Sequence, residues 1–198
     1  MFQILDAAET ILVREGADAL SLRQVAKEAD ITLGNLQYYF PTRAKLLEAI
    51  FERYATEFRA ERAAIVDGVD DSREMLIRVV DYWLKTEMRH EQELFWHLWA
   101  ISVHDDSARE AMEAIYGRLV KFLAFHLRRV QPALTTTQAA RRGASIVAII
   151  EGSGLFVGYR RHPTGALVGL QEEIREAVIA IIDRPPTPAT PAGVVSRA

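Results

Sequence analysis

SLRQVAKEADITLGNLQYYF, residues 21–40, is the stretch that decides the fold. Apolar side chains recur at three- and four-residue spacing in its first half, as expected for the buried face of a helix. Ser21 can cap this helix, because its hydroxyl can accept a backbone N–H group of the first turn. Asp30 suits the turn that follows, since aspartate tolerates a left-handed backbone. Thr32 can cap a second, short helix, which Leu36 and Phe40 would anchor to the core.

The remaining surface of this second helix is predicted to lie against DNA. It carries no charge, but it has two adjacent tyrosines, two amides and a glycine. Gly34 weakens a helix by about 1 kcal/mol relative to alanine, so its missing side chain is expected to let the backbone approach a partner. Amides can read adenine edges, and tyrosine hydroxyls can bond phosphate oxygens. Pro41 ends the helix, and Thr42, Arg43 and Lys45 then open the next helix, where they could hold a phosphate.

The residues TLGNLQYYFPTRAKLL, 32–47, resemble the recognition helix and the following helix of the TetR/AcrR family of bacterial transcriptional regulators. The positions that match the family pattern are Thr32, Gly34, Leu36, Tyr39, Phe40, Lys45 and Leu46. Two positions depart from it, since Gln37 stands where tyrosine is common and Asp30 stands where glycine is usual. The resemblance covers the chain from its start to about Phe51.

This resemblance implies an all-α fold with an N-terminal three-helix DNA-binding domain (1–58, helix-turn-helix motif 21–40) and a C-terminal ligand-binding and dimerisation domain (59–183). It implies a repressor that binds a palindromic operator in double-stranded DNA as a homodimer and is released by a small-molecule inducer. The reading helices would enter successive major grooves, and ligand and DNA would weaken each other's binding by the same factor. The residues expected at DNA are Ser21, Arg23, Thr32, Leu33, Gly34, Asn35, Gln37, Tyr38, Tyr39 and Lys45.

Helical patterns continue through most of the chain, and no segment shows the alternation of a strand. The predicted helices are 1–15, ended by Gly16, then 43–65, 72–90 capped by Ser72, 93–104, 106–130, a long helix capped by Thr136 or Thr137, and 165–182. Residues 184–198, RPPTPATPAGVVSRA, are rich in helix-breaking residues, so they are predicted to form a disordered tail.

The C-terminal half suggests an interface and a pocket. Small residues at Ala144, Ser145, Ala148 and Gly152 indicate a helix surface that another helix can approach. Since dimers of the resembling family form through the last two helices, the interface is expected at 137–160 and 165–183. Aromatic residues in this half fit either a core or a pocket for a small apolar or aromatic ligand. The residues expected in such a pocket are Trp83, Glu87, Trp96, His97, Trp99, Phe122, Phe125 and Glu151.

Composition excludes several other classes of protein. With 198 residues, 49% hydrophobic and 26% charged, the chain resembles a soluble globular protein. It has no cysteine, and its five histidines are scattered, so no disulfide, metal or other cofactor is expected. Asp6 and Glu9 interrupt any signal peptide, and no apolar run would span a membrane. The absence of cysteine fits a reducing cytoplasm, and the family resemblance implies a bacterial cytoplasmic protein that is at the nucleoid when DNA is bound.

The charge balance leaves alternatives open. The net charge is −3, and residues 1–50 carry five basic against seven acidic side chains. DNA affinity would therefore come from the local placement of Arg23, Arg43 and Lys45, with modest non-specific binding. One alternative is a dimeric adaptor that has lost DNA binding. The other is a helical enzyme, although no nucleophile with the spacing of a base and an orienting group is visible, so no catalytic residue is expected.

Overall fold

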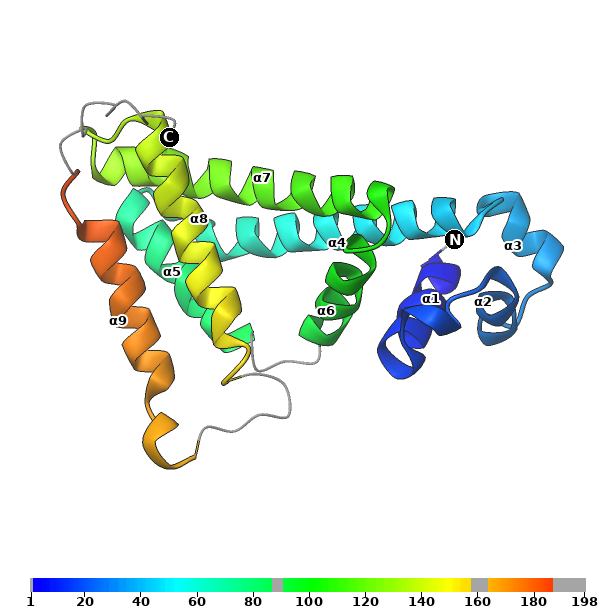
Figure 1. Ribbon diagram of the computed structural model, residues 1–198. Coiled ribbons are helices and arrows are strands. Elements are labelled where there is room, and N and C mark those ends of the chain that lie inside the picture. The colour runs from blue at the N-terminus through cyan, green and yellow to red at the C-terminus, as the bar shows by residue number, and fades with distance from the viewer. Residues whose placement is uncertain (1, 87–90, 158–163, 187–198) are drawn as a thin grey trace, which may run out of the picture.

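Helix α4 (Arg43–Val66) links the two parts of the molecule (Figure 1). The computed structural model describes residues 2–86, 91–157 and 164–186, and every regular element within them is helical. The other helices are α1 (Phe2–Glu15), η1 (Ala17–Ala19), α2 (Leu22–Glu28), α3 (Leu33–Tyr39), α5 (Ser72–Thr86), α6 (Glu91–Ser102), α7 (Asp106–Val130), α8 (Thr136–Ser153), η2 (Gly165–Leu167) and α9 (Leu170–Asp183). The all-α prediction is therefore confirmed.

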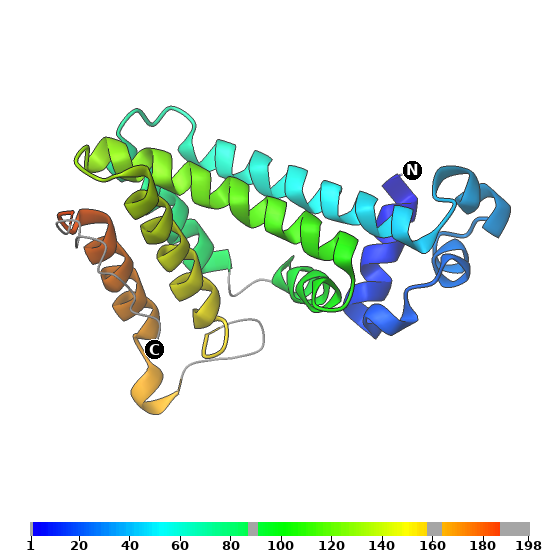
Figure 2. The ribbon, with the colours of Figure 1, turned by 45° about the horizontal axis from the view of Figure 1, so that its top comes forward.

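The long helices α4 and α7 lie side by side and span the molecule (Figures 1 and 2). Helices α1, α2 and α3 form a small head at one end of this pair, whereas α5, α8 and α9 pack at the other end. Helix α6 lies between the two groups, in contact with both α1 and α7. The order of the elements thus places the helix-turn-helix at one end of α4 and the larger bundle at the other.

Two side-chain caps and one left-handed residue form the helix-turn-helix, as the sequence predicts. The Ser21 hydroxyl accepts the N–H of Gln24, and the Thr32 hydroxyl accepts the N–H of Asn35, both at 3.2 Å. Asp30 between them takes a left-handed conformation with φ of 52°. Leu36 is completely buried. The predicted caps, turn and anchor of the two short helices are confirmed.

Two hydrophobic clusters form the interior, and α4 contacts both. The first joins the head to α6 and the start of α7, through residues such as Phe95 and Met112. The second is formed by α5, the later turns of α7, α8 and α9. Tyr54 packs against the first cluster and Phe58 against the second. The predicted boundary at residue 58 therefore falls within a continuous helix and not in a linker.

Three predicted helix starts are corrected, besides that of α6 (Glu91–Ser102), which lies two residues before the predicted range 93–104. Asp71, not Ser72, caps α5, because its Oδ1 atom accepts the N–H of Glu74 at 2.7 Å. Ser72 lies inside the protein, with its Oγ atom 3.0 Å from Nδ1 of His126. Thr135 caps α8 in a capping box with Gln138, so the cap is neither Thr136 nor Thr137, the two predicted positions.

The third correction concerns α9, which begins at Leu170 and not at Gly165. Residues 165–167 form a separate 3-10 turn, and Gly169 breaks the path to α9 with a left-handed φ of 88°. The predicted helix end at His90, residues 158–160 of the predicted interface and residues 187–198 of the predicted tail lie outside the described residues.

Candidate DNA-binding face and ligand cavity

The outer surface of α3 presents uncharged polar side chains to solvent. Asn35 and Gln37 are exposed, and Tyr38 and Tyr39 are 82% and 47% exposed. The two tyrosine rings meet edge to face, with centroids 5.2 Å apart. Such exposure is unusual for tyrosine in a soluble domain and suits hydroxyls that bond phosphate. The structure thus places both amides and both tyrosines at the surface, where a DNA groove could reach them.

The other predicted contact residues flank this surface. Ser21, Arg23, Thr32, Gly34 and Lys45 are exposed, whereas Leu33 is half-buried. An alanine-sized side chain at Gly34 would meet no atom within 4 Å, so neither packing nor backbone conformation in the free protein requires glycine. Lys45 forms an ion pair with Glu48 at 2.7 Å, which solvent exposure makes weak.

Arg43 forms hydrogen bonds to backbone carbonyl groups next to the helix-turn-helix. Its Nε atom donates to the carbonyl of Leu20 at 2.9 Å, and its Nη2 atom donates to the carbonyl of Ala17 at 3.2 Å. The guanidinium therefore ties the start of α4 to the segment before α2. Arg43 thus positions the helix-turn-helix, and because it is also exposed, its predicted contact with phosphate stays a prediction.

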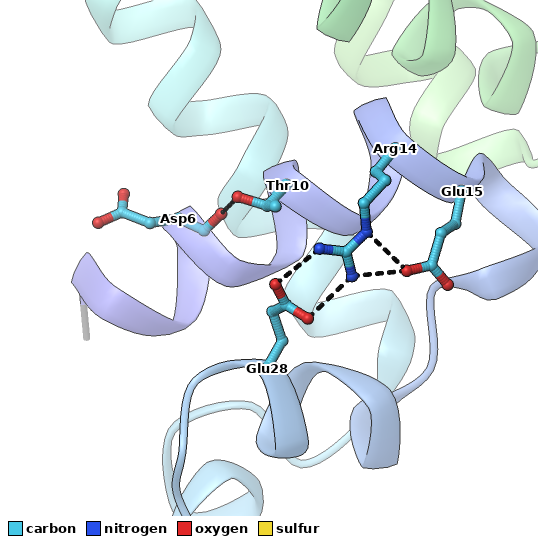
Figure 3. A network of polar contacts seen from close by, with 5 residues as sticks. All are labelled: Asp6, Thr10, Arg14, Glu15 and Glu28. Carbon is cyan, nitrogen blue, oxygen red and sulfur yellow. Dashed lines mark hydrogen bonds and ion pairs between the residues drawn. The ribbon is translucent and has the colours of Figure 1, made fainter.

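An ion-pair network joins α1 to α2 (Figure 3). Arg14 of α1 donates from Nη1 and Nη2 to the two carboxylate oxygens of Glu28 on α2, at 3.0 and 2.9 Å. The same guanidinium donates to Glu15 at 2.6 Å from Nη2. This paired geometry is the strong form of the contact, and it lowers the pKa of Glu28. The network fixes α2 against α1, and Arg14 also borders the cavity described next.

A cavity of about 840 Å³ lies between the head and the larger bundle. This volume is within the range of small-molecule sites. Six helices contribute to its lining, which consists of Asp6, Glu9, Thr10, Val13 and Arg14 from α1, Tyr54, Glu57, Phe58 and Glu61 from α4, Tyr82 and Trp83 from α5, Leu94 and Phe95 from α6, Ile115, Tyr116 and Leu119 from α7, and Val147, Ile150 and Glu151 from α8.

Aromatic rings form one wall of this cavity. The Phe58 ring lies nearly parallel to the rings of Tyr54 and Trp83, with centroid distances of 6.2 and 6.0 Å and interplanar angles of 13° and 9°. Phe95 adjoins Tyr54 at 5.9 Å and meets Tyr116 edge to face at 6.4 Å. This wall offers flat apolar surface from four helices to a bound molecule.

Two carboxyl groups in the cavity lining, one on α8 and one on α1, have raised pKa values because they are buried. Glu151 accepts a hydrogen bond from the Tyr116 hydroxyl at 2.8 Å, and burial raises the pKa of this carboxyl group. Burial also raises the pKa of Glu9 to about 7. The Oε1 atom of Glu9 has no hydrogen-bond partner, although Arg53 Nε lies 3.4 Å away in an ion pair. Both groups therefore favour an added positive partner.

The predicted ligand residues divide between the cavity and the surface. Trp83 and Glu151 line the cavity, whereas His97 does not. Trp96, Trp99 and Phe125 are 39%, 45% and 58% exposed and lie outside the lining. Phe122 is half-buried outside the cavity, under the Arg62 guanidinium at 4.5 Å. Glu87 lies outside the described residues.

The residues expected in the pocket from the sequence include none from α1 or α4, although both helices contribute to the lining. Tyr54 and Phe58 are four residues apart, and Glu57 and Glu61 have the same spacing beside them. An aromatic pair beside an acidic pair on one helix could have indicated that α4 lines a cavity. Nothing in the local pattern of Glu9 indicates that it borders a cavity, because its neighbours there come from elements far along the chain.

Among the residues that the structure describes, no group of three or more histidine, aspartate or glutamate side chains could hold a metal ion. None of the helices in residues 2–86, 91–157 and 164–186 is both long and apolar enough to cross a membrane.

A helix-turn-helix head joined by one long helix to a bundle with a cavity of small-molecule size defines the class of helical transcription regulators. Sequence models give the family. The model for bacterial regulatory proteins of the TetR family matches residues 4–50, and that for the C-terminal domain of BetI-type transcriptional repressors matches residues 72–174. The chain belongs to the TetR family. It is therefore a DNA-binding transcriptional regulator and not an enzyme.

Known proteins resemble the chain over most of its length. It is 29% identical to an uncharacterised helix-turn-helix regulator in the dhlA 5' region of Xanthobacter autotrophicus, covering 73% of this chain and 72% of the relative. It is 24% identical to the nicotine-responsive repressor HdnoR of Paenarthrobacter nicotinovorans, covering 77% and 80%. A regulator from Saccharomonospora viridis, crystallised with choline, shares the fold with a TM-score of 0.70 at 22% identity, covering 92% and 94%.

Proposed function

We propose that the protein is a ligand-responsive repressor that binds a palindromic operator as a homodimer and is released by a small-molecule inducer. The observation that carries this proposal is the continuity of α4 from the cavity to the end of the reading helix. Tyr54, Phe58 and Glu61 on α4 line the cavity, and Thr42 caps the same helix two residues after Phe40. A molecule in the cavity therefore touches the element that carries α3.

Helix α1 supplies a second route from ligand to DNA. Five of its residues, between Asp6 and Arg14, line the cavity, and Arg14 is bonded to Glu28 on α2. A ligand that fits better when α1 and α4 are displaced would lower DNA affinity, because it favours a state in which the two reading helices of the dimer are differently spaced. By linkage, operator DNA would lower ligand affinity by the same factor.

Exposed small and apolar residues support a dimer through α8 and α9. Ala144, Ser145 and Ala148 form an exposed small-residue surface on α8, and Leu155 and Phe156 beyond its end are 62% and 53% exposed. On α9 the exposed residues include Ala177 and Ala180. Apolar surface in this position is stabilised when a second copy covers it.

The exposed face of α3 supports sequence reading in the major groove. We assign base contacts to Asn35 and Gln37, because their amides can pair with adenine edges. We assign phosphate contacts to Tyr38, Tyr39 and Lys45, with Ser21, Arg23 and Thr32 beside them and Leu33 at the thymine methyl or sugar surface. Gly34 would permit close approach of the α3 backbone.

The named relatives support a small-molecule effector. One is described as responsive to nicotine, and one structural neighbour was crystallised with choline. We infer that the cavity of this chain is likewise an effector site.

DNase footprinting on the DNA upstream of the gene for this protein tests the proposal. A protected site with two related half-sites about one helical turn or more apart is the expected result. Lys45→Glu should abolish protection, whereas the control Lys121→Glu, an exposed change on α7, should keep it. Protection that is equal for both variants would contradict the assigned surface. If the protein is an adaptor that has lost DNA binding, neither substitution should change the footprint.

A further inference from the structure

The cavity lining carries an excess of negative charge. Five carboxylates line it, from Asp6, Glu9, Glu57, Glu61 and Glu151, against one basic side chain, Arg14. The Arg14 charge is already engaged by Glu15 and Glu28. A bound anion would therefore meet a repulsive lining, whereas a cation would meet an attractive one.

We propose that the effector of this cavity is an organic cation with a bulky apolar or aromatic body, and that Glu151 is its counter-ion. This inference rests on the proposed function, because it takes the cavity to be the effector site. It specifies the chemical class that the site selects.

Glu151 is the carboxylate in the lining that is best placed for this role. It is half-buried on α8, and within the described part of the chain no basic side chain forms an ion pair with it. The Tyr116 hydroxyl donates to it and fills one acceptor site of a group that has about four. A carboxylate removed from water without a positive partner is costly, so a cation in the cavity would stabilise it.

The other carboxylates differ from Glu151 because they already have partners. Arg53 donates to Asp6, donates to Glu57 at 2.9 Å, and lies 3.4 Å from Glu9. Glu61 is exposed and accepts a hydrogen bond from Tyr82 at 3.1 Å. The α1 side of the cavity thus contains its own positive charge, whereas the α8 side does not. The positive charge of a bound cation would therefore be most favourable next to Glu151.

The aromatic wall fits the same ligand class. Tyr116 bonds Glu151 and contacts the Phe95 ring, which adjoins Tyr54. A cation near Glu151 would therefore lie close to electron-rich ring faces, which attract positive charge. The parallel rings of Tyr54, Phe58 and Trp83 extend this wall and could stack with an aromatic body.

The cavity volume sets the size of the ligand. At about 840 Å³ it lies near the upper end of the range for small-molecule sites. A cation as small as choline would leave most of the apolar surface unfilled. We therefore expect tight binding only for cations with several rings or long apolar groups.

Isothermal titration calorimetry with two probes of matched shape tests the sign of the charge. Tetraphenylphosphonium and tetraphenylborate are both bulky and aromatic, but the first is a cation and the second an anion. The full-length protein should bind the cation at least about tenfold more tightly than the anion, and more tightly than choline. Equal binding of both probes, tighter binding of the anion, or no binding of the cation would overturn the proposal.

Glu151→Gln tests the counter-ion, since glutamine keeps the shape and an acceptor for Tyr116. Tetraphenylphosphonium affinity should fall about tenfold, whereas the control Glu113→Gln, an exposed change on α7, should alter it less than about twofold. An unchanged affinity in Glu151→Gln would overturn its role, and the probe pair on the unaltered protein decides the ligand class even if the variant does not fold. Footprinting of the same preparation tests the regulator function separately.

Discussion

The reading surface lies on α3, a helix of seven consecutive residues, whereas the cavity draws its lining from six helices between Asp6 and Glu151. The first is exposed and carries no charge, and its geometry follows from two hydroxyl caps and one left-handed residue. The second is partly buried, aromatic and acidic, and exists only after distant segments have packed. Changes to the two regions should therefore separate DNA binding from ligand binding, except at α1 and α4, which serve both.

The largest effect is expected from Leu36→Ala, which removes the completely buried anchor of α3. The void that Leu36→Ala leaves under α3 should lower the free energy of unfolding by about 3 kcal/mol, measured by urea denaturation. DNA binding should be lost, while tetraphenylphosphonium binding should remain. Leu119→Ala removes a side chain of the same type from the cavity wall, and it should weaken probe binding but not DNA binding. Loss of both activities in both variants would mean that the two regions are not separable.

Two changes on α3 should distinguish base reading from phosphate contact. Gln37→Ala should alter base preference by about 1–3 kcal/mol at one operator position, because an amide contact is removed. Tyr39→Phe should weaken operator and random DNA alike, because the lost hydroxyl contacts phosphate. Competition binding on a set of single-base operator variants measures both. If Gln37→Ala kept affinity and sequence preference unchanged, the reading role of Gln37 would be wrong.

A smaller effect is expected from Glu9, where the head borders the cavity. Burial raises its pKa from 4.5 to about 7, so between these values the folded protein holds a proton that the unfolded chain has released. Stability contributed through Glu9 is therefore lost as pH rises through this window. Glu9→Gln should raise the free energy of unfolding at about pH 8 by about 1 kcal/mol, after allowance for partial exposure, and change little at about pH 4. A variant no more stable than the unaltered protein at the higher pH would show that Glu9 is not strained by burial.

Two glycine-to-alanine changes should have small effects of opposite sign. Gly34→Ala places its new methyl group in open space, so it should stabilise α3 by up to about 1 kcal/mol but weaken DNA binding. Gly143→Ala brings its Cβ atom within 3.2 Å of Leu123 Cβ and 3.4 Å of the Val120 carbonyl, so it should destabilise the α7–α8 contact by about 1 kcal/mol. Melting temperatures and DNA affinities of the pair provide the test. A Gly34→Ala variant with unchanged DNA affinity would show that the α3 backbone does not approach DNA closely.

The same contrast explains how much the sequence could predict. Ser21, Asp30 and Thr32 act on backbone groups within a few residues, so the helix-turn-helix could be predicted from local chemistry. The range 106–130 was also predictable, because one long apolar stripe defines it. The helix caps Asp71 and Thr135 were misplaced by one or two residues, since adjacent hydroxyl and carboxylate residues offer competing caps.

The cavity was less predictable because periodicity identifies a buried face but not what that face meets. Trp83 was expected in the pocket and lines it, whereas Trp96 and Trp99, expected on the same grounds, are exposed on α6. Glu9 and Tyr54 border the cavity because α1 and α4 meet helices that lie far along the chain. Only the folded arrangement brings them beside Glu151.

Fluorescence anisotropy of the purified protein on DNA from upstream of its own gene tests the central claim most directly. Scrambled DNA of equal length serves as the control, at two salt concentrations. A ligand-responsive repressor should bind the upstream fragment more tightly at both salt concentrations and should be released when tetraphenylphosphonium is added. Weak binding that is equal on both fragments and lost with modest salt would contradict the account.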